Sequence, residues 1–340
     1  AHLGNPGGWQ AVGYDFRHTS IEGFANFHEF QVGGVVFAPT VGELQTVPGE
    51  LENPDGGYRS RFDKKDEVAA PGYYSVLLKD YGVKAELTAM KRVGFHRYTY
   101  PKTELANLIF DIGNKQGESG EVKVGTFVKD VVNPGKHQEK GPGAGLYMTF
   151  STEEQEAVEV KVGLSYTSIE NARFNRETEA ADVTFDQAKK NATDVWNESL
   201  SRIYVEGGKE TDKVKFYTGL FHALLGRGLA SDANGYYPKN NGTVGRIALD
   251  EEGNPVHQHY NTDAIWGGFW NLTQLWSLAY PEYYSDWIKS QLLVYQDAGW
   301  LGDGIACSKY VSGILLAWLL LLHIIAVFVI LTYSRDMKLL

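Results

Sequence analysis

Histidine, arginine, tryptophan and carboxylate side chains recur in stretches that are rich in aromatic residues and glycine. The set consists of His28 and Glu29 in GFANFHEFQVGG, His96 and Arg97 in GFHRYTYP, and Asp263 and Trp266 in YNTDAIWGGFWN. Sugar rings stack their C–H faces on tryptophan or tyrosine, and carboxylates accept pairs of hydrogen bonds from hydroxyl groups. The pattern therefore favours a carbohydrate-binding site.

Each of these residues also has a purely structural interpretation. His28 and Glu29 could form a partly buried pair, and a histidine on a strand, such as His96, is more often structural than catalytic. Asp263 could cap a helix, and Trp266 could belong to a core. The chain contains no GxSxG, HExxH, Walker or GxGxxG motif, so spacing alone identifies no reaction.

Composition narrows the class of protein. The 340 residues are 43% hydrophobic, which is typical of a folded chain of about two domains. The net charge is −10 and no long basic run occurs, which argues against a nucleic-acid partner. Cys307 is the single cysteine, so an intrachain disulfide is excluded. The first ten residues do not have the pattern of a signal peptide.

Hydrophobic spacing divides the chain into strands followed by helices. Residues 31–170 alternate apolar and polar positions between turn signals such as Pro71-Gly72, which predicts short antiparallel strands in a sandwich. After about residue 182 the apolar residues recur every three or four positions, which predicts helices. Pro281 is expected to end one helix and begin the next, at residues 281–300.

Residues 314–333 form a nearly unbroken apolar run, followed by Arg335 and Lys338. As a helix this run would span about 30 Å, the thickness of a bilayer core. A membrane partner is therefore predicted through residues 314–333. The alternatives are a buried core helix and a frameshift artefact, because composition changes abruptly after Gly313.

Four asparagines begin an Asn-X-Ser/Thr triplet: Asn191, Asn197, Asn241 and Asn271. Such triplets accept glycans only in a eukaryotic secretory route, and chance matches are common. Asn191 and Asn197 fall within a predicted helix.

Several blocks, in order, resemble glycoside hydrolase family 92, a family of α-mannosidases. The blocks are HTSIEGFANFHEF (18–30), EVAAPGYYSVLLKDYGVKAELTAMKRVGFHRYTYP (67–101), FYTGLFHALLGRGLASDANGYY (216–237) and IWGGFWNLTQLWSLAYPE (265–282). The resemblance implies a two-domain β + α fold: an antiparallel β-sandwich over 1–181, a linker helix over 182–208 and an incomplete (α/α)6 barrel over 209–313. The apolar tail of 314–333 follows it.

The resemblance also implies exo-hydrolysis of α-mannosidic bonds with inversion, Ca²⁺ as cofactor and an α-mannose-containing glycan as partner. Inversion needs an acidic and a basic carboxyl about 6.5–9.5 Å apart. No block of this chain matches those that carry these carboxyls in the family, so we expect the chain to be inactive, with no catalytic residue and with most calcium ligands missing.

By the same resemblance His28, Glu29, His96, Arg97, Asp263 and Trp266 are expected to bind substrate. Many family members have an aspartate directly after the tryptophan, whereas this chain has Gly267, and Asp263 is expected to substitute for it. The alternatives are a membrane-tethered carbohydrate-binding or degenerate protein, and a different barrel enzyme that uses Asp263 or Asp303 with Glu29. The expected location is secreted, periplasmic or at the cell surface.

Overall fold

The computed structural model divides the chain into two compact units. The first unit takes its residues from 1–162 and 179–196, and the second from 163–178 and 197–340. The described residues are 16–25, 35–51, 53–111, 127–128, 131–132, 135, 144–225, 228–239, 241–260, 271–299, 304–306 and 309–311.

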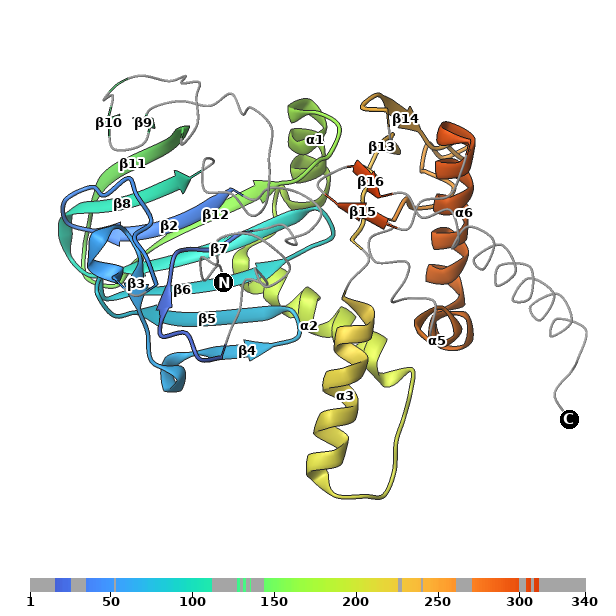
Figure 1. Ribbon diagram of the computed structural model, residues 1–340, viewed down its shortest axis with the longest axis horizontal. Coiled ribbons are helices and arrows are strands. Elements are labelled where there is room, and N and C mark those ends of the chain that lie inside the picture. Colours follow the sequence, from blue (N-terminus) through green and yellow to red (C-terminus); the bar gives the residue numbers. More distant parts are fainter. Residues whose placement is uncertain are drawn as a thin grey trace, which may run out of the picture. The chain divides into compact units, whose positions relative to one another are not determined.

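Two five-stranded sheets form the first unit (Figure 1). One has the strand order β10-β9-β11-β8-β2 and the other β12-β7-β6-β5-β4. The strands of the first sheet are β2 (Val36–Val41), β8 (Thr103–Asp111), β9 (Phe127–Val128), β10 (Val131–Val132) and β11 (Ala144–Thr152). Those of the second are β4 (Val68–Ala70), β5 (Tyr73–Leu78), β6 (Val83–Ala89), β7 (Val93–Tyr100) and β12 (Glu156–Gly163). A short antiparallel pair, β1 (Ser20–Ile21) with β3 (Ser60–Arg61), completes the unit.

Alternating side chains give each strand of the second sheet two different faces. In β7, Tyr98 and Tyr100 belong to the main core, whereas Val93 and Phe95 belong to a separate cluster on the opposite face. Successive side chains of a strand point to opposite faces, so the period of two in the sequence becomes two buried surfaces. Both faces of β7 are therefore buried, one in the main core and the other in the separate cluster.

The main core lies between the two sheets. Ala106 and Leu108 of β8 share one hydrophobic cluster with Val76 of β5 and Tyr98 of β7. Fully burying a valine or leucine side chain such as Val76 or Leu108 contributes about 1.5–3 kcal/mol by removing it from water. Sheets that share a core in this way form a sandwich. The prediction of an antiparallel β-domain followed by helices is confirmed.

Helix α2 (Phe185–Ser201) begins on the outer face of the second sheet. Phe185 and Ala188 pack in the cluster of Val93 and Phe95. Thr184 and Gln187 form a capping box, because the Thr184 N–H donates to Gln187 Oε1 (2.9 Å) and the Gln187 N–H donates to Thr184 Oγ1 (3.3 Å). The predicted helix is thus present from residue 185.

The second unit contains most of the remaining helices. They are α1 (Ile169–Ala180), α3 (Glu210–Leu224), α5 (Leu272–Ala279) and α6 (Pro281–Ala298), with the short strand pairs β13 (Tyr236–Pro238) with β14 (Val244–Arg246) and β15 (Gly304–Ala306) with β16 (Lys309–Val311). The sequence pattern did not predict α1, whose residues fall between the last predicted strand and the predicted linker helix. Only Asn175 and Ala180 among its twelve residues are fully buried, so it lacks the apolar stripe by which helices are recognised.

Aromatic side chains build the core of the second unit. Trp276 of α5 packs edge-to-face on Trp287 of α6, with ring centroids 6.0 Å apart, and its indole N–H donates to the Ala223 carbonyl at 3.3 Å. Helix α6 has Pro281 in its first turn and ends at Gly299, which has a positive φ of 78°. The sequence predicted the start of this helix at Pro281 and its extent over about 281–300; a glycine with positive φ is a common end of a helix.

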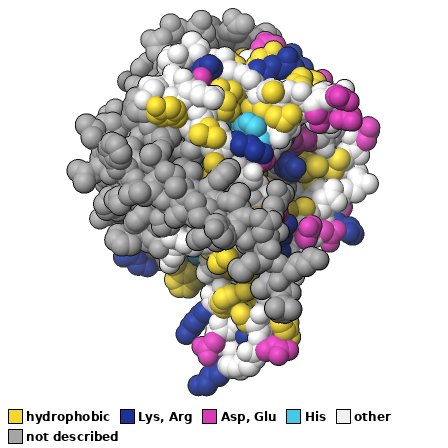
Figure 2. All heavy atoms as spheres, turned by 90° about the vertical axis from the view of Figure 1, so that its right-hand side faces the viewer, with side chains coloured by type: hydrophobic (Ala, Val, Ile, Leu, Met, Phe, Trp, Pro, Cys, Tyr) yellow, Lys and Arg dark blue, Asp and Glu magenta, His cyan; other side chains and the backbone are white. Residues whose placement is uncertain are grey.

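Helix α3 carries several hydrophobic side chains on its exposed surface. Val214 is 59% exposed and Phe216 is 38% exposed, and Leu220 alone is fully buried. Figure 2 shows hydrophobic side chains among charged ones on the lower projection of the molecule. Among the described helices, none is both long and apolar enough to cross a membrane. The predicted span at 314–333 lies outside the described residues.

Candidate functional site

The described residues on either side of His28 and Glu29 meet at one point of the sandwich. Both residues lie outside the described part of the chain. On either side of them, Phe24 and Phe37 exchange two backbone hydrogen bonds of 2.9 and 2.8 Å. Gly23 permits this approach, because a Cβ there would lie 2.4 Å from Val36 Cγ1. Gly23 and Phe24 therefore bring the two ends of the segment 25–36 together.

His96 lies inside the sandwich core beside this closure. Its ring is 1% exposed and its centroid lies 4.9 Å from that of Phe37. Its Nδ1 shares a 2.6 Å hydrogen bond with the Tyr98 hydroxyl. Burial lowers the pKa of His96 to about 3, because the charged imidazolium would lose its hydration. The side chain is therefore neutral near pH 7 and cannot act there as a cation.

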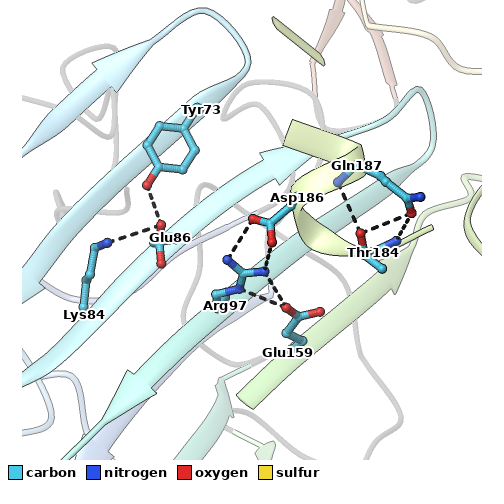
Figure 3. Close-up of polar contacts among 8 residues, drawn as sticks. All are labelled: Tyr73, Lys84, Glu86, Arg97, Glu159, Thr184, Asp186 and Gln187. Atoms are coloured by element: carbon cyan, nitrogen blue, oxygen red, sulfur yellow. Dashed lines mark hydrogen bonds and ion pairs between the residues drawn. The ribbon is translucent and has the colours of Figure 1, made fainter. Parts of the chain in front are cut away.

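Arg97 points to the opposite, outer face of the same sheet. Its guanidinium donates to both carboxylate oxygens of Asp186, at 3.0 and 3.1 Å, and its Nε donates to Glu159 at 2.9 Å (Figure 3). The group also lies 4.3 Å from the ring centroid of Phe185. The Asp186 hydrogen bond is the main cause that raises the pKa of Arg97 above its usual range. Arg97 thus links β7 to β12 and to the first turn of α2.

The structure therefore separates two residues that the sequence places side by side. His96 faces the main core and Arg97 faces α2, as the alternation of a strand requires. One ligand cannot contact both side chains from the same side of the sheet. Of the two predicted substrate-binding residues that the structure describes in the first unit, His96 lies next to the Phe24–Phe37 closure and Arg97 faces away from it.

Asp263 and Trp266 also lie outside the described residues, but the segments that flank them are well held. The Tyr260 N–H donates to Ser290 Oγ of α6 at 2.9 Å, and the Tyr260 ring packs on Tyr283 at 4.5 Å. At the other end, the Asn271 carbonyl accepts from the Leu275 N–H in the first turn of α5. The segment that contains both residues is thus anchored to α5 and α6 within the second unit.

Sequence reasoning missed a buried carboxylate in the second unit. Asp232 is 1% exposed, and its two oxygens accept from Asn175 Nδ2 (2.7 Å) and from the Thr167 hydroxyl. Asn175 Oδ1 in turn accepts from the Ala233 N–H at 2.8 Å. The sequence shows a turn signal around Asp232, in SDANG, but its partners are more than fifty residues away. Asp232 therefore ties this turn to α1 rather than facing solvent.

His259 is a second buried residue that sequence reasoning missed. Its backbone accepts from the Ala230 and Ser231 N–H groups, and its ring lies 4.7 Å from that of Tyr237. Burial lowers the pKa of His259 to about 4. Tyr237 also donates to Asp297 at 2.9 Å. This neutral, aromatic-lined histidine lies directly before the 261–270 segment.

The calcium implied by the family resemblance does not find a fitting site in the described part of the chain. No three His, Cys, Asp or Glu side chains among those residues come together as a metal site requires. The buried oxygens of Asp232 are already taken by Asn175 and Thr167. No catalytic step can therefore be derived through a metal from these residues.

Two family profiles match the chain, one over the β-sandwich and one over the helices that follow it. Residues 3–126 match the glycosyl hydrolase family 92 N-terminal domain, and residues 171–312 match the glycosyl hydrolase family 92 catalytic domain. Both profiles describe domains of one glycosyl hydrolase family, and they match the β-sandwich and the helices in that order. The chain belongs to glycosyl hydrolase family 92.

Solved structures show the same fold. The family GH92 alpha-mannosidase BT3965 from Bacteroides thetaiotaomicron is 24% identical, with a TM-score of 0.79 over 88% of this chain and 46% of that one. A second structure of that protein contains mannoimidazole. The inverting mannosidase BT2199 from Bacteroides thetaiotaomicron VPI-5482 is 19% identical, with a TM-score of 0.71 over 88% of this chain and 44% of that one. The chain thus spans less than half the length of these structures. No curated protein sequence matches it significantly.

Proposed function

We propose that this chain supplies the sandwich and the first helices of an exo-acting α-mannosidase that hydrolyses α-mannosidic bonds with inversion. The observation that carries the proposal is the match to the family's catalytic domain over residues 171–312. The likeness to mannosidase structures, one of them with mannoimidazole bound, supports mannose as the recognised sugar. The substrate class would be a glycan that ends in α-linked mannose.

Within this proposal, His28, Glu29, Asp263 and Trp266 bind the sugar. The carboxylates would accept hydrogen bonds from hydroxyl groups, and Trp266 would stack on the ring. The closure at Phe24 and Phe37 supports this role for the first pair, because it holds both ends of their segment against the sandwich. His96 would pack against Phe37 at the end of this segment. Arg97 would hold the first turn of α2 against the sheet.

We further propose that a polypeptide of these 340 residues binds the sugar but does not hydrolyse it. Inversion needs one protonated carboxyl and one ionised carboxylate with a water molecule between them. The more buried carboxylates of the second unit are engaged in other contacts. Asp232 accepts from Asn175, and Asp297 accepts from Tyr237 and Lys239. Calcium, if the enzyme uses it, would need ligands from outside the described residues.

A binding and hydrolysis experiment tests the proposal. We expect methyl α-D-mannoside to bind the chain at least about tenfold more tightly than methyl α-D-glucoside, since a site that hydrogen-bonds one hydroxyl rejects its epimer. Titration followed by NMR measures both affinities. Glu29→Gln should weaken mannoside binding, whereas the exposed Glu153→Gln serves as the matched control.

Hydrolysis is measured on the same samples with 4-nitrophenyl α-D-mannoside. No nitrophenol should be released. Its release by the purified chain would show that the polypeptide is active and would overturn the second proposal alone. Equal affinity for the two methyl glycosides, or no affinity for either, would count against mannose recognition by this chain.

A further inference from the structure

The hairpin of β13 and β14 presents a tight turn at the surface of the second unit (Figure 1). The Lys239 N–H donates to the Thr243 carbonyl at 2.9 Å, and Gly242 adopts a positive φ of 79° inside the turn. The turn end of the hairpin is anchored, because Lys239 Nζ lies 2.6 Å from Asp297 of α6. The turn residues Asn241 and Thr243 are both exposed.

Asn241 and Thr243 hold each other in a defined arrangement. Asn241 Oδ1 accepts from the Thr243 hydroxyl at 2.6 Å and from the Thr243 N–H at 3.0 Å. Among the described residues, Nδ2 of Asn241 donates no hydrogen bond, so it is available to an external group. Two donors on an amide oxygen withdraw electrons from it and favour loss of a proton from the nitrogen. The nitrogen is thereby prepared as a nucleophile.

The triplet in helix α2 at Asn191 lacks this arrangement. Its Thr193 hydroxyl donates to the Lys189 carbonyl at 2.9 Å, which is the usual bond of a threonine in a helix. Asn197 lies in the same helix, where the helical backbone keeps its side chain away from the residue two positions later. Neither helical asparagine is polarised by its own triplet.

The triplet at Asn271 differs from that at Asn241 in the burial of its threonine. Thr273 is 7% exposed, and its hydroxyl donates to Gln274 Oε1 at 3.0 Å. The hydroxyl that a glycan-transferring enzyme must recognise is therefore buried at the start of α5. Of the four Asn-X-Ser/Thr triplets in the chain, Asn241 alone combines an exposed turn with a hydroxyl bonded to its own asparagine.

We propose that Asn241 is an N-glycan acceptor whenever the chain enters a compartment that contains an oligosaccharyltransferase. The sugar donor would be a lipid-linked oligosaccharide diphosphate. Nδ2 of Asn241 attacks the anomeric carbon, so that a C–N bond forms while the bond from that carbon to phosphate oxygen breaks. The lipid diphosphate leaves with the electron pair, and the transferase accepts the amide proton. This inference is independent of the proposed hydrolase activity.

The test uses the full chain, fused to a cleavable signal sequence and expressed in eukaryotic cells. Chain is collected from lysate and medium together, so that retention in the cell does not hide the result. Release of glycans by peptide N-glycosidase in heavy-oxygen water labels the acceptor and distinguishes it from spontaneous deamidation. Mass spectrometry should find the heavy label at Asn241 and a single glycan per chain.

Substitutions confirm the site independently of the label. Asn241→Gln and Thr243→Ala should abolish the gel shift that the glycosidase removes, and Thr243→Ser should keep it. Asn191→Gln, Asn197→Gln and Asn271→Gln are the matched controls and should leave it unchanged. A shift that persists in Asn241→Gln, label at another asparagine, or wild-type chain without any glycan would each overturn the proposal.

Discussion

At the scale of single residues, burial decides the acid–base behaviour of His96. The ring lies between two sheets and shares a hydrogen bond with the Tyr98 hydroxyl. Its pKa falls to about 3, whereas an unfolded histidine titrates near 6.5. Between these values the unfolded chain binds a proton and the folded chain does not. Stability therefore falls as the pH falls from about 6.5 towards 3, and it is restored as the pH rises.

His96→Gln should remove this pH dependence from the sandwich. Glutamine can still bond to the Tyr98 hydroxyl but does not titrate. In the wild type we expect the His96 contribution to fall by up to about 1.4 kcal/mol per pH unit below pH 6.5. Urea-dependent hydrogen exchange of the β7 peptide at several pH values measures it. His222→Gln, at an exposed position of α3, is the control, and an unchanged slope in His96→Gln would contradict the prediction.

At the scale of elements, Arg97 anchors the first turn of α2 to the sandwich. It joins Glu159 on β12, Asp186 on α2 and the face of Phe185. One turn further along, Lys189 lies 3.5 Å from the ring centroid of Tyr73. Further along the helix, a Cβ at Gly72 would lie 2.9 Å from that of Ala192. Contacts in successive turns thus hold the start of this helix against the sheet.

Arg97→Ala should loosen the start of α2 without unfolding the sandwich. The lost stacking and packing are worth about 1–2 kcal/mol, since ion pairs that are partly exposed add little. Faster hydrogen exchange in residues 185–192 measures the effect. Arg97→Lys should restore only part of it, because lysine lacks the planar fork. Lys190→Ala removes an exposed pair of the same helix and serves as the control; equal effects of Lys190→Ala and Arg97→Ala would contradict the anchor.

At the scale of the whole molecule, the described residues form two units without a metal cluster among them. Because the family resemblance implies that most calcium ligands lie beyond this chain, we expect Ca²⁺ to leave the thermal unfolding of this polypeptide unchanged. A ligand that binds the folded chain would raise the unfolding temperature by mass action. Calorimetry in Ca²⁺ and in EDTA, with Mg²⁺ as the control cation, measures the difference. A rise specific to Ca²⁺ would place its ligands in residues outside the described ranges.

The sequence by itself determined the local elements and the family. Alternation identified the strands around residues 83–100, and Pro281 marked the start of α6, because these signals act within a few residues of the chain. The sequence pattern did not predict helix α1, because this helix has few apolar residues to form a recognisable stripe.

Only the tertiary structure decided the surroundings of the polar side chains. It put His96 in the core and Arg97 under α2, joined Asp232 to Asn175 across the chain, and distinguished Asn241 from three triplets with the same pattern. Burial and hydrogen-bond partners depend on contacts between distant segments. A local pattern carries no information about which of those segments will meet.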